Sequence, residues 1–226
     1  MKLEEVILQT NQPDAIKRFY GTLLGLDVYE DSLSGISFRT GSSRLSFTKA
    51  YAEEKAYYHI AFAIPSNKSE EAKQWVKEKG VALYSKDGKD EFFFENWNAT
   101  AFYFYDPDGN LIEFIAHHMV DYAVDERFGP EHLLRISEIG LPVEDVPEAV
   151  RNLIGTFQLN EWGGDGQQFA PLGDAGGALI VVNKNRPWFP DGRLPGTFAT
   201  NVVISHSDSA HLRLQNDLYQ LSSSKK

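Results

Sequence analysis

The chain has 226 residues, of which 42% are hydrophobic and 13% aromatic, enough for a packed core and too many for a disordered chain. Its 32 acidic and 22 basic side chains leave a net charge of −10, which argues against binding to nucleic acid or an anionic membrane. The absence of cysteine excludes disulfides and thiolate metal sites. No apolar run is long enough to span a membrane, and the first residues read as a strand rather than a signal peptide, so we expect a cytoplasmic protein.

The N-terminal segment predicts a strand, a helix and further strands. The first strand is expected over residues 5–10, and the helix over 16–25, where Gly25 suits its end. After the helix, strands are predicted at 35–40 and 44–49, on either side of a turn of small residues.

A second segment repeats this order. It opens with a strand at 59–64, continues with a helix at 68–79, and has its remaining strands at 81–85, 100–105 and 111–115. Glu5 and His59 open the two segments at matching positions. The period is about fifty residues, which indicates an internal structural repeat.

The remaining chain predicts a third copy and part of a fourth. The third copy has a strand at 136–143, a helix at 146–154, and further strands around 168–169 and 178–183. The fourth is expected to have a strand at 201–205 and a helix near 209–221, shortly before the last residue. Glu138 and Asn201 stand where Glu5 and His59 stand, but the position matching Glu113 is expected beyond the last residue. A second complete site in this half is therefore not expected.

A tight turn over residues 106–110 precedes an unusual carboxylate. Pro107 presets the backbone for the turn, and Gly109 supplies its left-handed position. Glu113 then falls inside the apolar run 111–115. A carboxylate in a strand that is otherwise suited to burial is costly unless it is neutralised, and a bound cation is one solution.

Three runs carry a family resemblance: LEEVIL at 3–8, YHIAFA at 58–63 and DPDGNLIE at 106–113. Together they resemble the vicinal oxygen chelate superfamily of glyoxalase I, bleomycin and fosfomycin resistance proteins and extradiol dioxygenases. The resemblance implies an α+β fold in which repeated βαβββ modules form cupped mixed sheets with helices outside. It also implies a complete paired domain at 1–116, a linker at 117–133, and a second domain at 134–226 that is truncated in its last module.

The resemblance implies a divalent metal in the cup of the first domain, with Glu5, His59 and Glu113 as ligands and Glu113 also as a catalytic carboxylate. Strand alternation is compatible with this, because His59 shares a face with the small residues Ala61 and Ala63. One imidazole and two carboxylates suit Fe²⁺, Mn²⁺, Ni²⁺, Co²⁺ or Zn²⁺. An ordinary charged residue on an edge strand is an equally good interpretation of Glu5. For His59, the alternative interpretation is a buried histidine of the core.

Arg39 and Tyr103 are the candidate substrate-binding residues, although Arg39 also reads as solvated charge at a hairpin end. The implied reactions are isomerisation of a glutathione-like hemithioacetal, ring cleavage of a catechol, or thiol transfer, and fold analogy does not choose among them. The alternative is a binding protein that sequesters a cationic small molecule without chemistry. An incomplete fourth module leaves a sheet edge that a second copy could cover, so a homodimer is expected.

Overall fold

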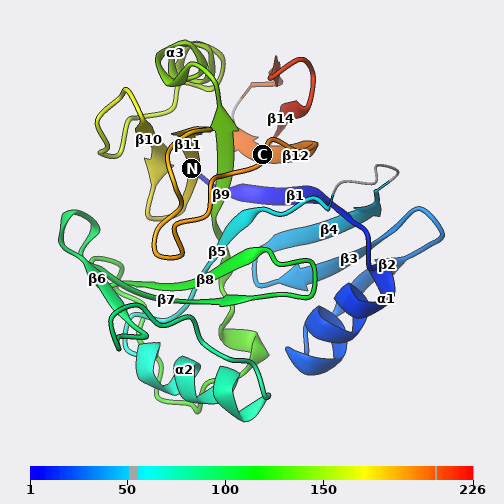
Figure 1. Cartoon of the computed structure of the whole chain (residues 1–226), viewed down its shortest axis with the longest axis vertical. Coiled ribbons are helices and arrows are strands. Elements are labelled where there is room, and N and C mark those ends of the chain that lie inside the picture. Colours follow the sequence, from blue (N-terminus) through cyan, green and yellow to red (C-terminus); the bar gives the residue numbers. More distant parts are fainter. Residues whose placement is uncertain (51–54, 207, 226) are drawn as a thin grey trace.

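The computed structural model describes residues 1–50, 55–206 and 208–225, and it has an α+β fold built from two seven-stranded mixed sheets (Figure 1). The strands are β1 Leu3–Thr10, β2 Val28–Asp31, β3 Gly35–Thr40, β4 Ser43–Lys49, β5 His59–Ala63, β6 Phe92–Phe94, β7 Ala99–Tyr105, β8 Leu111–His117, β9 Arg135–Val143, β10 Phe169–Asp174, β11 Gly177–Asn183, β12 Thr200–His206, β13 His211–Leu214 and β14 Tyr219–Lys225. The helices are α1 Pro13–Ile16, which continues as a π-helix over Lys17–Leu23, α2 Ser69–Glu78 and α3 Val146–Phe157; short 3₁₀ turns cover Glu95–Trp97 and Pro130–His132.

The two sheets combine the modules in a crossed order. The first sheet runs β13-β14-β12-β1-β4-β3-β2 and joins the first module to the fourth. The second sheet runs β10-β11-β9-β5-β8-β7-β6 and joins the second module to the third. The grouping expected from the sequence, with the first two modules paired within 1–116, differs from this arrangement. The repeat reveals the modules, but it does not determine which strand edges meet.

The central strands of the second sheet pack differently on their two faces. Ile60, Phe62 and Phe114 point into the main hydrophobic core. Ala61 and Ile115, which point the other way, belong to a smaller apolar cluster that also contains Tyr103. This is the alternation predicted for strands with a cupped polar side. Figure 1 shows α2 covering the outer face of β7 and β8, with α3 at the far end of the sheet beside β10 and β11.

The helix predicted near 209–221 is wrong. This segment forms the hairpin of β13 and β14, in which His211 pairs with Ser222. The strand pattern alternates exposed and half-buried side chains, and Asn216 and Asp217 adopt left-handed conformations at the turn, with φ of 52° and 67°. Among the described residues, the fourth module therefore has its last strand, β14, but it lacks the helix and one of the strands that the first module has.

The strand predicted at 81–85 is also wrong, because this segment contributes only an isolated bridge from Leu83 to Phe104. Its place at the edge of the second sheet is taken by β6, which pairs with β7. The other predicted helices and strands are confirmed, with ends that shift by a few residues. Gly25 follows the first helix with φ of 72°, as its position as a helix stop requires.

Candidate metal centre

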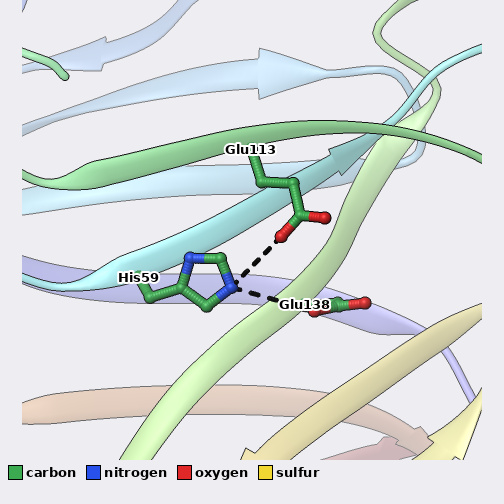
Figure 2. Close-up of side chains that lie close together, drawn as sticks. All are labelled: His59, Glu113 and Glu138. Carbon is green, nitrogen blue, oxygen red and sulfur yellow. Dashed lines mark ion pairs between the residues drawn. The ribbon is translucent and has the colours of Figure 1, made fainter. Parts of the chain in front are cut away.

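Three buried side chains from adjacent strands of the second sheet meet at one point. They are His59 on β5, Glu113 on β8 and Glu138 on β9, and we call them the triad (Figure 2). The His59 Nε2 atom lies 3.3 Å from Glu113 Oε2 and 3.8 Å from Glu138 Oε2. Their ligand atoms all lie within 4.8 Å of one another. The three residues are almost inaccessible to solvent, with exposed fractions of 5% for His59 and 3% for each glutamate.

Strand register explains why these three positions converge. Ala61 pairs with Glu113 on the parallel neighbour β8 and with Glu138 on the antiparallel neighbour β9. Both carboxylates therefore flank the small side chain of Ala61, which leaves room between them. His59 lies two residues earlier on the same face of β5, so its ring reaches both carboxylates.

The charges of the triad depend on one another. Burial alone would lower the pKa of His59, but the neighbouring carboxyl groups of Glu113 and Glu138 outweigh this and raise the pKa to about 10. Burial, followed by the negative charge of Glu113, raises the pKa of Glu138. At neutral pH, this raised pKa keeps a proton on His59, between the side chains of Glu113 and Glu138. A metal ion bound by the triad would have to displace that proton.

The orientation of the His59 ring is fixed from its other side. Its Nδ1 atom lies 3.2 Å from the backbone oxygen of Leu111, which can only accept, so Nδ1 donates there and Nε2 faces the carboxyl groups of Glu113 and Glu138. The ring of Trp188 lies 5.1 Å from the imidazole, measured between ring centroids. Trp188 also lies against Gly140, where an added Cβ would be only 2.7 Å from the indole. The absence of a side chain at position 140 thus allows Trp188 to pack beside the triad.

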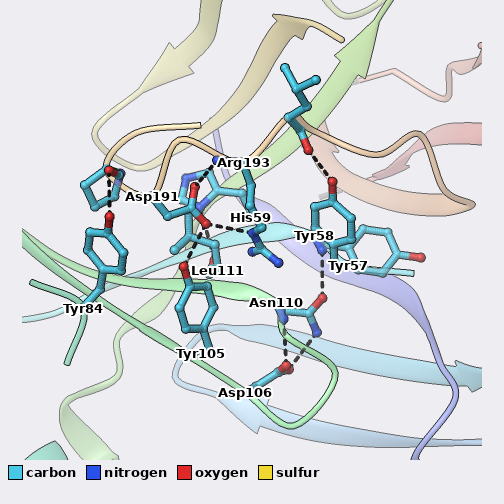
Figure 3. Close-up of polar contacts among 12 residues, drawn as sticks. Tyr57, Tyr58, His59, Tyr84, Tyr105, Asp106, Asn110, Leu111, Asp191 and Arg193 are labelled. Carbon is cyan, nitrogen blue, oxygen red and sulfur yellow. Dashed lines mark hydrogen bonds and ion pairs between the residues drawn. The ribbon is translucent and has the colours of Figure 1, made fainter. Parts of the chain in front are cut away.

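The predicted turn at residues 106–110 ties β8 to the start of β5. Asp106 accepts hydrogen bonds from the backbone and side chain of Asn110, and Tyr20 donates to it at 2.9 Å. The side-chain oxygen of Asn110 in turn accepts from the backbone nitrogen of Tyr58 at 2.8 Å (Figure 3). Tyr58 immediately precedes His59. The turn therefore sets the position of the histidine relative to the strand that carries Glu113.

A cavity of about 640 Å³ opens above the triad. Its lining includes the triad, Tyr103, Glu95 and Trp97. The segment between β11 and β12 forms part of its wall, where Asp191 accepts a hydrogen bond from Tyr105 at 2.9 Å (Figure 3). Burial, followed by the negative charge of Glu113, raises the pKa of Tyr103 well above its ordinary value. The Tyr103 hydroxyl therefore stays protonated and faces Glu113 at the base of the cavity.

The residues of the triad fit a divalent metal. One imidazole and two carboxylates supply nitrogen and oxygen donors of the kind that first-row divalent ions accept. Glu138 Oε1 is buried and has no hydrogen-bond partner among the described residues. Such an atom is costly to bury unless something else binds it. The triad therefore offers three donor side chains and one carboxylate oxygen with no other use.

Glu5 is not part of the triad. It lies on β1 in the other sheet, where Arg44 Nε donates to its Oε1 at 2.6 Å and Ser46 donates at 2.7 Å. Burial alone would raise the pKa of Glu5, but the hydrogen bonds from Arg44 and Ser46 lower it. Arg39, the other predicted residue outside the cavity, is exposed on β3 and stacks on the ring of Tyr29 at 4.9 Å. The structure thus brings His59, Glu113 and Tyr103 together and separates both Glu5 and Arg39 from them.

Glu138 is the residue that the sequence-based site omits. The repeat already places it at the third module's equivalent of Glu5, so the signal was present. What was missing is the pairing of β5 with β9, which brings the first strand of the third module beside His59. The strand register also identifies the position on β11 that matches Glu113 on β8, because β11 pairs with β9 as β8 pairs with β5. It is occupied by Ile180, which lines the cavity and offers no ligand atom.

Comparison with known proteins decides the family. The profile of the Glyoxalase/Bleomycin resistance protein/Dioxygenase superfamily matches residues 2–114, half of the chain. The chain belongs to this superfamily. Comparison with curated protein sequences gives no significant match.

Solved structures of this superfamily's fold cover nearly the whole chain. A putative dioxygenase from Bacillus subtilis matches with a TM-score of 0.68 and 12% identity, over 99% of this chain and 85% of that one. Glyoxalase I from Zea mays matches with a TM-score of 0.61 and 13% identity, over 99% of this chain and 92% of that one. At these identities the likeness shows a shared fold, which covers the C-terminal half as well.

Proposed function

We propose that the chain binds one divalent metal ion at His59, Glu113 and Glu138 and acts there on a small oxygen-bearing substrate held in the cavity. The observation that carries this proposal is the buried triad at the base of a 640 Å³ cavity. A cavity of this size suits a small organic molecule. The candidate ions remain Fe²⁺, Mn²⁺, Ni²⁺, Co²⁺ and Zn²⁺.

The surrounding residues suggest how such a site would work. When bound, the ion would serve as a Lewis acid that stabilises negative charge on substrate oxygens. Glu113, the carboxylate nearer to His59, is the candidate for moving a proton to or from the substrate. The protonated hydroxyl of Tyr103 would donate a hydrogen bond, and the aromatic walls would exclude water. The proposed reactions are isomerisation or lyase chemistry, ring cleavage, and thiol transfer.

Elemental analysis of the purified protein tests the metal site. We expect about one ion per chain in the wild type and loss of that ion in Glu113→Ala and in Glu138→Ala. Glu5→Ala is the matched control, because it removes a carboxylate from a strand of the other sheet, and it should keep the ion. A full complement of metal in both triad variants would contradict the proposal.

A second candidate function is the sequestration of a cationic aromatic compound without metal. The feature that favours it is the combination of aromatic walls with the carboxylates Glu113 and Glu138 at the base and with Glu95 and Asp165 also lining the cavity. Stoichiometric binding of a basic aromatic compound that is unchanged by chelator would support this function, as in a bleomycin-resistance type of protein. Binding that requires added metal would exclude it.

The location and assembly of the protein are further parts of the proposal. None of the described helices is long and apolar enough to cross a membrane. We place the protein in the cytoplasm as a homodimer, in which a second copy would cover a sheet edge such as β13. Light scattering coupled to size-exclusion chromatography measures the mass directly, and a value near 25.5 kDa at all concentrations would rule out the dimer.

A further inference from the structure

Arg186 is the only arginine or lysine among the described residues that line the cavity. It lies in the turn that follows β11, where its backbone nitrogen donates to the Asn183 oxygen at 2.9 Å. Its guanidinium lies 4.5 Å from the centroid of the Phe169 ring, which supports it through a cation–π contact. The side chain is half-buried. Arg186 is therefore held in place at the cavity rather than extended into solvent.

The positive charge of Arg186 has no direct ion pair among the described residues. Asp165 is near enough for Arg186 to contribute to the lowered pKa of its carboxyl, but backbone hydrogen bonds from Gln168, Gln167 and Phe169 contribute more. All three bonds go to one oxygen of Asp165, at 2.7 to 2.9 Å, so this carboxylate shapes its own loop. The neighbouring cation Lys184 differs, because it is paired with Glu144 at 2.7 Å. The guanidinium of Arg186 thus keeps its donors for a ligand.

The walls between Arg186 and the triad are mainly aromatic. The aromatic lining residues, Tyr103 aside, are Phe93, Phe94, Trp97, Phe169, Trp188 and Phe189. Flat apolar walls favour a planar or aromatic ligand body, because stacking adds to the free energy gained by burying apolar surface. A ligand that fills the cavity also removes water from Arg186. An arginine desolvated in this way is costly unless the ligand supplies an opposite charge.

We propose that the cavity takes a substrate with a flat aromatic body and an oxyanion group, and that Arg186 binds this oxyanion. The inference rests on the proposed function for the other end of the substrate, which would face the triad. A carboxylate, sulfonate or phosphate group could each accept two parallel hydrogen bonds from the guanidinium. Arg186 would then determine specificity by selecting anionic over uncharged aromatic compounds.

A pair of fluorescent probes that differ in one oxyanion tests the inference. The probe 8-anilino-1-naphthalenesulfonate has the same rings as N-phenyl-1-naphthylamine but adds a sulfonate. Both are titrated into the metal-free full chain, into Arg186→Gln, and into Lys184→Gln as a control that removes a paired cation from the same turn. Because one ionic hydrogen-bonded contact is lost, we expect Arg186→Gln to weaken sulfonate binding about tenfold to a hundredfold. The uncharged probe should change little, and Lys184→Gln should change neither.

Two results would overturn the inference. One is a sulfonate probe that binds the wild type no better than the uncharged probe does. The other is an Arg186→Gln variant that weakens both probes equally. Metal content is measured separately on the wild type and the same variants purified without chelator, so failure of the oxyanion subsite is distinguished from failure of the metal site. Increasing salt should reduce the sulfonate preference of the wild type, since the contact is ionic and lies at a half-exposed position.

Discussion

Metal binding by this chain should depend steeply on pH well above the usual range of histidine. The pKa of about 10 at His59 means that the metal-free triad holds a proton on the imidazole throughout the neutral range. A metal ion must displace this proton to use Nε2 as a ligand. Each unit of pH below 10 therefore costs about a tenfold loss of apparent affinity. The raised pKa of Glu138 acts in the same direction, because any proton on this carboxyl must also leave.

The size of the change in metal affinity with pH distinguishes a His59 with a raised pKa from a histidine with the ordinary pKa. From about pH 6.5 to about pH 8.5, the apparent affinity should rise about a hundredfold if the pKa is near 10, but only about twofold if it is near the ordinary value of about 6.5. Isothermal titration of the metal-free protein with Mn²⁺ at constant ionic strength measures the change. Titration in two buffers with different enthalpies of ionisation counts the protons released. We expect about one or more per metal ion at neutral pH.

A rise of twofold or less, with no proton released, would refute the reasoning, because it would mean that His59 is neutral before metal arrives. The stability of the metal-free protein gives an independent check. The raised pKa stabilises the folded state fully below about pH 6.5, and this contribution should be lost as pH rises toward about 10. Urea unfolding across this range should therefore show declining stability. Glu113→Gln, which removes one of the two charges that raise the pKa of His59, should make both dependences shallower.

Three substitutions, the first of them with a matched control, test the surrounding structure. Gly140→Ala should destabilise the fold by about 1–3 kcal/mol in urea unfolding, because the new Cβ meets the Trp188 ring, and it should weaken Mn²⁺ binding as well. The matched change Gly155→Ala, where nothing lies within 4 Å of the new Cβ, should be neutral or stabilise the helix by up to about 1 kcal/mol. Glu5→Gln should leave Mn²⁺ affinity unchanged in calorimetry and cost about 1 kcal/mol of stability, and a loss of affinity would return Glu5 to the site. Asn110→Ala leaves a buried backbone N–H unpaired and should cost about 1–3 kcal/mol by thermal unfolding, whereas an unchanged midpoint would show that the turn does not hold β5 in place.

The modules and two of the three triad residues could be predicted from the sequence, because both depend on local patterns. His59 opens its strand at a repeated position, and Glu113 is a carboxylate in an apolar run next to a recognisable turn. Alternation then assigns each of them to the cupped face of its strand. Glu138 has the same local character. Its partnership with His59 is set by the antiparallel pairing of β5 with β9, a contact between distant parts of the chain that no local pattern encodes.

The hairpin of β13 and β14 illustrates a different limit. The repeat predicts a helix after the strand at 201–205, because every earlier module has one there. The segment from His211 to Leu214 instead alternates exposed and half-buried side chains. Such an alternation over four residues is too short to outweigh the expectation from the repeat. Here the local signal was right, and the inference by analogy with the other modules was not.

The contact between Glu5 and Arg44 shows that the two sheets balance the charge of their carboxylates in different ways. In the first sheet, the carboxylate at the repeated position receives its counter-charge from a side chain of the same chain. In the second sheet, the triad contains two glutamates and one imidazole, and the positive charge of the imidazole depends on a proton taken up from solution. The charge of Glu5 is thus balanced within the chain at neutral pH, whatever the metal concentration. The charge of the triad instead depends on the protons and metal ions that the solution supplies.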